Sequence, residues 1–155
     1  MEIEVAAKML NVPGEVEPYA NLKKILKEKN AYTILKTLCD PDHYPSVRRW
    51  ALEGFATFSK PEVSKVLKNS LADPFMTVRL HAMRAIYERN KDPELKALIP
   101  LLEDESGGIR LNALQILGGK RYKGLHKKID AMLTDEKNYI RKKAKEILDT
   151  EWDKK

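Results

Sequence analysis

The chain has 155 residues, 43% of them apolar and 34% charged, which is enough for one domain, or two very small ones, with a continuous core. No apolar run approaches the roughly 18–20 residues that cross a membrane, and the acidic start MEIEVAAKML is unlike a basic signal peptide. The single cysteine, Cys39, excludes an internal disulfide and a multi-cysteine zinc site. We therefore expect a cytoplasmic protein without a membrane span or a structural metal.

The net charge of +6 is concentrated near the C-terminus, where residues 119–155 carry 12 basic and 7 acidic side chains. A basic end of this kind can contact phosphate groups or acidic proteins. A solvated helix rich in lysine and glutamate has the same composition.

Apolar residues spaced three and four apart predict helices along the whole chain, with no alternating strand pattern. Ser59-Lys60-Pro61-Glu62 has the form of a capping box with proline in the first turn, and Gly118-Gly119 is typical of a helix end. In chain order, the expected helices span residues 2–10, 19–29, 30–39, 46–58, 61–71, 76–90, 94–103, 108–118, 122–133 and 137–152.

Four segments repeat with a period of 31 residues. The columns that recur are Val47-Arg48, Val78-Arg79, Ile109-Arg110 and Ile140-Arg141; Asp42, Asp73, Asp104 and Asp135; and Ala51, Ala82, Ala113 and Ala144. Each segment predicts two antiparallel helices. One such pair cannot bury its apolar stripe alone, so neighbouring pairs must stack.

The best copy, Asp73-Pro74-Phe75-Met76-Thr77-Val78-Arg79-Leu80-His81-Ala82, resembles the signature of HEAT-like repeats in their short form. The resemblance implies an all-α, right-handed α-solenoid whose second helices line the concave side. It places the repeat domain at residues 30–155, with units near 30–58, 59–90, 91–120 and 121–152, after an N-terminal cap or degenerate repeat at 1–29. It also implies that the recurring Asp and Arg form a structural ladder. The alternative for these arginines is a row of phosphate contacts.

Catalytic patterns are missing from the sequence. His43, His81 and His126 form no HExxH or paired His-Glu arrangement, which argues against the metal-binding hydroxylases with HEAT-like repeats. No phosphate-binding glycine motif is present, nothing marks the bilin pocket of the HEAT-like bilin lyases, and Cys39 is typical of a small core residue. We therefore expect no enzyme, catalytic residue, cofactor, metal site or small-molecule substrate.

The repeat also predicts which side chains face a partner. Outward positions of the second helices give a mixed surface of aromatic, amide and basic groups, typical of protein interfaces. The predicted contacts are Arg49, Trp50, His81, Arg84, Asn112, Gln115 and Lys143. Trp50 is either a binding hot spot or packs on the N-terminal segment or on the first helix of the next unit. The first hypothesis is thus a monomeric, non-catalytic scaffold or adaptor that binds a protein partner.

The second hypothesis is nucleic-acid binding by the basic C-terminal units. The predicted phosphate contacts are Lys120, Arg121, Lys123, Lys127, Lys128, Arg141, Lys142 and Lys145. Convergence of these charges on one face would favour DNA or RNA, and their scatter would favour a role in solubility.

Overall fold

The computed structural model describes residues 1–152, apart from the side chain of Glu151, and these residues form helices and turns without a β-strand. The chain divides into two compact units, Met1–Arg89 and a second unit that begins at Asn90. No helix among residues 1–152 is long and apolar enough to span a membrane.

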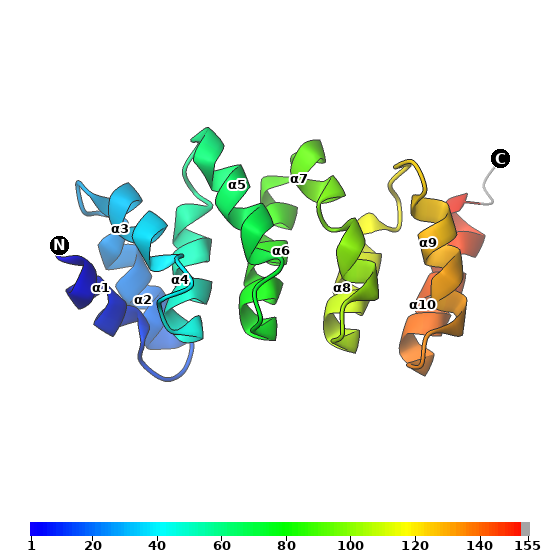
Figure 1. Cartoon of the computed structure of the whole chain (residues 1–155), viewed down its shortest axis with the longest axis horizontal. Helices are drawn as coiled ribbons and strands as arrows, with labels where there is room; N and C mark the ends of the chain where they lie inside the picture. The colour runs from blue at the N-terminus through cyan, green and yellow to red at the C-terminus, as the bar shows by residue number, and fades with distance from the viewer. Residues whose placement is uncertain (153–155) are drawn as a thin grey trace. The chain divides into compact units, whose positions relative to one another are not determined.

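The first unit consists of three helix pairs, drawn from blue to green in Figure 1. Within it, α4 packs on α3 and on α6, and both α1 and α2 pack on α4. Residues 1–29 therefore contribute a helix pair of their own. The helices are α1 (Ile3–Leu10), α2 (Val16–Ile25), α3 (Ala31–Leu38), α4 (Pro45–Phe55), α5 (Pro61–Ser70) and α6 (Met76–Arg89).

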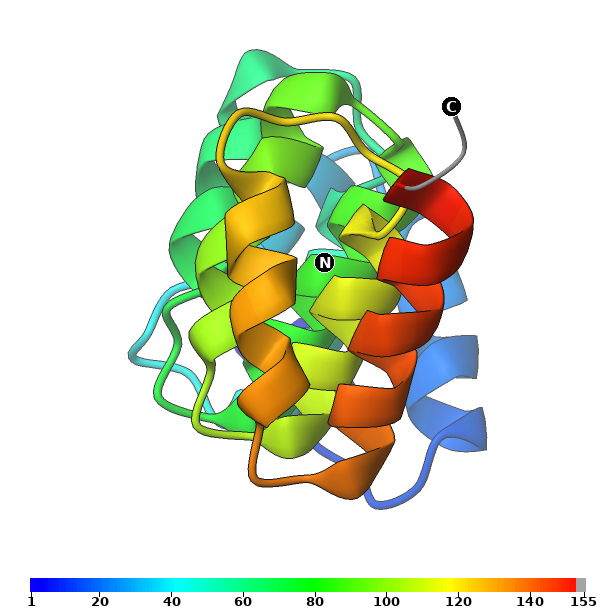
Figure 2. The same ribbon diagram turned by 90° about the vertical axis from the view of Figure 1, so that its right-hand side faces the viewer.

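The second unit consists of two helix pairs whose first members are short. Figure 2 shows α9, in orange, antiparallel to and beside α10, in red-orange. The elements are α7 (Asp92–Lys96), a 3₁₀ helix η1 (Ile99–Glu103), α8 (Gly107–Leu117), α9 (Leu125–Ala131), a 3₁₀ turn η2 (Met132–Thr134), α10 (Asn138–Ile147) and a π-helical turn η3 (Leu148–Trp152).

The helices expected at 94–103 and 122–133 differ from the observed ones. The first is divided into α7 and η1, because Pro100 has no N–H to continue an α-helical ladder and sits instead in a tighter 3₁₀ turn. The second begins at Leu125, since Gly124 precedes it with a φ of 78°, a left-handed conformation that glycine adopts without strain.

The repeating apolar columns form the core. Val47, Val78, Ile109 and Ile140 are buried, as are the four alanines at 51, 82, 113 and 144. Small alanines at these positions let neighbouring helices approach closely, while the β-branched residues fill the space between them. The predicted all-α solenoid class, built from stacked antiparallel helix pairs, is confirmed within each unit.

Candidate functional site

A groove of about 460 Å³ crosses the second helices of the first unit, α2, α4 and α6. Its apolar lining comes from Leu22, Leu26, Gly54 and Ala85. The polar and aromatic lining comes from three helices in turn: Tyr19 and Lys23 on α2, Glu53 and Thr57 on and after α4, and Arg84 and Glu88 on α6. α2 and α6 thus each contribute a pair of residues four apart, the spacing that places side chains on one helix face, and Glu53 and Thr57 have the same spacing although Thr57 follows the end of α4.

Gly54 allows α2 to lie close to α4. A Cβ atom added at Gly54 would stand 2.6 Å from Leu22 Cδ1 and 2.9 Å from Leu35 Cδ1, both below van der Waals contact. The next unit has Ala85 in this column and the following ones Ile116 and Ile147. The glycine therefore belongs to the position where the N-terminal helix pair meets the repeats, and it is part of the groove lining.

Trp50 is buried rather than displayed, with 4% of its surface exposed. Its ring centroid lies 6.4 Å from that of Tyr19 on α2 and 6.1 Å from that of His81 on α6. The expectation that Trp50 projects toward a partner is wrong, and the alternative, packing on the N-terminal segment, is what occurs. The reason is that α2 lies beside α4 and its Tyr19 reaches the tryptophan ring.

His81 is also buried, at 5% exposure, so its side chain is not part of an open surface as expected. Its Nδ1 lies 2.5 Å from Glu53 Oε1, a hydrogen-bonded contact between α6 and α4. Because Glu53 lines the groove, this contact with a buried histidine holds one of the groove carboxylates in position.

The remaining charged groups of the groove have no salt bridge within residues 1–152. Arg84 and Glu88 are exposed and lie one helical turn apart on α6 without pairing with each other. Lys23 lies over the Tyr19 ring, with Nζ 4.3 Å from the ring centroid, and Tyr19 is half exposed. The groove therefore offers an apolar lining, an aromatic edge and two unpaired opposite charges.

The other predicted partner contacts lie elsewhere and are engaged in local interactions, except Gln115, which is exposed on α8. Arg49 pairs with Glu15 at 2.8 Å and stacks on Trp50. In the second unit, Asn112 Nδ2 donates to the carbonyl of Gly108, and Lys143 pairs with Glu146. Of the seven predicted contacts, only Arg84 lines the groove. The sequence analysis did not predict the groove residues Tyr19, Lys23, Leu26 and Glu88.

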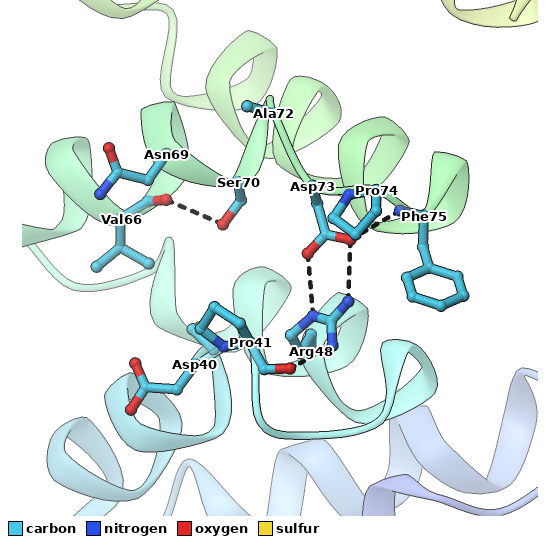
Figure 3. Close-up of a pocket in the computed structure, with 11 residues that line it drawn as sticks. Asp40, Pro41, Arg48, Val66, Asn69, Ser70, Ala72, Asp73, Pro74 and Phe75 are labelled. Carbon is cyan, nitrogen blue, oxygen red and sulfur yellow. Dashed lines mark hydrogen bonds and ion pairs between the residues drawn. The ribbon is translucent and has the colours of Figure 1, made fainter.

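A second cavity of the first unit, about 340 Å³, lies at the turns that precede α4 and α6 (Figure 3). Arg48 and Asp73 face each other there, joined by two hydrogen bonds of 3.0 and 2.9 Å, and Arg48 also donates to the carbonyls of Pro41 and His43. Asp73 Oδ1 additionally accepts the N–H of Phe75. These polar groups already satisfy one another, so the cavity offers a ligand few free donors.

The predicted Arg–Asp ladder is present in both units. Arg110 binds Asp135 at 2.8 and 3.0 Å, and Arg79, Arg110 and Arg141 each donate to two carbonyls of the turn before their own helix. The guanidinium donors of Arg48 and Arg110 are occupied by carboxylates and carbonyls. The alternative, that these two arginines form a row of phosphate contacts, is therefore wrong. Asp42 makes no hydrogen bond among the described residues. The arginine that would bind it belongs one period before Arg48, and the sequence has Glu17 at that position.

Two local environments shift the titration of ladder and core groups. The hydrogen bonds from Arg110 hold the pKa of the Asp135 carboxyl below its usual range, and the same contact raises the pKa of Arg110. Burial raises the pKa of the Cys39 thiol well above its usual value, which disfavours the thiolate. Cys39 is thus a core residue, as its sequence context predicts.

The predicted phosphate contacts of the second unit are spread over a loop and two antiparallel helices (Figure 2). Lys128 pairs with Glu103 and Lys145 with Asp149, while Arg141 binds backbone carbonyls. The guanidinium of Arg121 lies 4.2 Å from the centroid of the Trp152 ring. Lys120, Lys123, Lys127 and Lys142 complete the set, on the loop before α9, on α9 and on α10.

Trp152 packs on α9 and on the residue that follows α8. Its Nε1 donates to the carbonyl of Gly118 at 3.2 Å, and its ring lies edge-on to His126, 5.0 Å between centroids. Among residues 1–152, no cluster of three or more His, Cys, Asp or Glu side chains is arranged to hold a metal ion.

No protein-family model matches the chain, and no curated protein matches its sequence. Solved structures do match. The complex of CpcE and CpcF of phycocyanin lyase from Nostoc sp. PCC7120 aligns with a TM-score of 0.67 and 17% identity, over 94% of this chain and 96% of that chain. The match shows a shared fold, an all-α solenoid of stacked helix pairs. An engineered protein aligns with a TM-score of 0.54 and 17% identity, over 96% of this chain and 78% of that one.

Proposed function

We propose that this HEAT-like protein is a non-catalytic scaffold or adaptor that binds a protein partner in the α2–α4–α6 groove. The observation that supports it best is the unpaired Arg84 and Glu88 beside an apolar lining. Arginine and tyrosine are enriched at protein interfaces, where apolar cores are surrounded by polar rims. In this proposal the repeat unit is the 31-residue segment, and its second helix provides the binding face.

The charge of the groove favours a protein over a nucleic acid. Lys23 and Arg84 are accompanied by Glu53 and Glu88, so the groove is mixed rather than uniformly basic. Nucleic-acid surfaces carry a strong positive excess because each phosphate contact requires a cation. The groove also lacks a paired nucleophile and base: its one neighbouring histidine, His81, is buried against Glu53.

The structural comparison supports this proposal by analogy. The similar solved structure is described as a complex of two proteins, CpcE and CpcF. Stacked helix pairs present extended surfaces on which partners bind in many unrelated repeat proteins. In the second unit, Asn112, Gln115 and Lys143 stay predicted contacts for the same partner.

Photo-crosslinking tests the proposal in cells that produce the protein. A photo-crosslinking amino acid in place of Thr57, which lines the groove, should give one discrete protein adduct. The same amino acid in place of Lys65, exposed on α5, is the control. The adduct should disappear with Arg84→Glu, and the purified partner should bind the wild-type chain. Equal crosslinking from both positions, or none from Thr57, would contradict the proposal.

A further inference from the structure

The groove has features that restrict the chemistry of its occupant. Resting on the function proposed above, we infer that the partner contributes a short segment with one apolar side chain between an acidic and a basic residue. The acidic residue pairs with Arg84, the basic residue with Glu88, and the apolar side chain contacts Leu22, Leu26 and Ala85.

The two charges of α6 are available to a partner. Arg84 precedes Glu88 by four residues, and this order, with the base nearer the helix N-terminus, is the less favourable one for an ion pair within a helix. Neither side chain forms a salt bridge in the described part of the chain. A guanidinium can donate two parallel hydrogen bonds to the two oxygens of a carboxylate in a planar, bidentate pair, which gives orientation as well as affinity.

The apolar lining lies between α6 and the opposite edge of the groove. Leu22 and Ala85 are nearly buried, whereas Leu26 is partly open, so a side chain placed there removes apolar surface from water. Tyr19 and Lys23 form the opposite edge, where the ammonium group lies over the ring. The volume of about 460 Å³ falls within the roughly 300–1,000 Å³ typical of ligand pockets.

The mixed charges disfavour occupants of a single sign. A uniformly acidic segment would meet Glu53 and Glu88, and a uniformly basic one would meet Lys23 and Arg84. Like charges brought together at an interface reduce affinity strongly. The order along α6 also fixes a direction: the acidic residue lies toward the Met76 end of the helix and the basic residue toward the Arg89 end.

Selection from displayed random peptides tests the inference. The full-length chain and the charge-reversed variant R84E/E88K are each panned against the same library of short peptides. Selection with the wild-type chain should enrich peptides that have an apolar residue between an acidic and a basic residue. Selection with the variant should enrich peptides in which the acidic and basic residues have exchanged places. In fluorescence anisotropy, each single charge reversal, R84E or E88K, should lower the affinity for a peptide selected by the wild-type chain by about tenfold. The matched reversals K65E on α5 and E4K on α1 should leave its affinity unchanged.

The outcomes separate this inference from the proposed function. Peptides without a charge pattern, equal binding to R84E/E88K, or no enrichment by the wild-type chain would overturn the inference. A groove-dependent protein adduct at Thr57 would then still support the scaffold function with a different occupant. Displacement of the selected peptide by an oligonucleotide would overturn both, because the groove would then prefer phosphate.

Discussion

Arg48 reaches from α4 to Asp73, in the turn before α6, and donates two hydrogen bonds of 3.0 and 2.9 Å to its carboxylate oxygens. The same side chain holds the carbonyls of Pro41 and His43 in its own turn. Arg110 and Asp135 repeat the arrangement in the second unit. One side chain therefore closes its own turn and ties it to the turn of the next helix pair, which fixes how the pairs stack.

Removing this contact should destabilise the protein. Arg48→Ala leaves the nearly buried carboxylate of Asp73 without its partner, and we expect the free energy of unfolding to fall by about 3–5 kcal/mol. Urea unfolding followed by circular dichroism measures the change. The control, Arg84→Ala on the exposed face of α6, should stay within about 0.5 kcal/mol of the wild type. Equal losses for both variants would contradict a special role for the ladder.

The Arg110–Asp135 pair predicts a pH dependence. Because the pKa of Asp135 is lowered in the folded state, the pair contributes stability above the pKa of the unfolded carboxyl and loses it as the pH falls through the folded pKa. The difference in unfolding free energy between the wild type and Asp135→Asn should therefore shrink on acidification below about pH 4. A difference that stays constant, or an equal trend with the exposed Asp130→Asn, would contradict this assignment.

Burial of Trp50 predicts a structural defect when it is truncated. Trp50→Ala should lower the free energy of unfolding by about 3–5 kcal/mol, because it leaves a cavity between α2, α4 and α6. Tyr19→Ala removes a half-exposed ring and should lower the free energy of unfolding by clearly less than Trp50→Ala. Both values come from the same urea titration. An undiminished stability of Trp50→Ala would mean that the tryptophan is not part of the core.

The repeat columns predicted the core, and the resemblance to HEAT-like repeats implied the ladder, but neither predicted the groove. Val47 and Ala51 recur in four copies, and a residue that recurs at one helix position must meet the same neighbours each time. For Trp50 the sequence left two alternatives open, a binding hot spot or packing on a neighbouring segment. The repeat register shows on which side of α4 the side chain lies, but it does not show which helix covers that side. The covering helix, α2, carries no repeat motif. Its Tyr19 and Lys23, four residues apart, were the signal for a second exposed face.

The basic residues of the second unit should not make this protein a nucleic-acid binder. Lys128 and Lys145 pair with carboxylates and Arg141 with carbonyls, and the other predicted contacts are spread over a loop and two helices rather than gathered on one helix. Anisotropy with labelled single- and double-stranded oligonucleotides should give weak binding, with a shallow dependence on salt. Tight binding that weakens about a thousandfold between roughly 50 and 200 mM salt would contradict this and restore the phosphate hypothesis. The variant K142E/K145E would then show whether α10 is the site.

The partner-binding groove itself is tested most directly by mapping a bound peptide on the protein. Amide spectra of the isotope-labelled full-length chain are recorded while a peptide selected by the wild-type protein is added. We expect shifts concentrated at Tyr19, Lys23, Arg84 and Glu88, and we expect R84E/E88K to abolish them at the same peptide concentration. Shifts confined to the turns around Phe75 or to α9 and α10, with the groove residues unchanged, would contradict the assignment of the α2–α4–α6 groove as the binding surface.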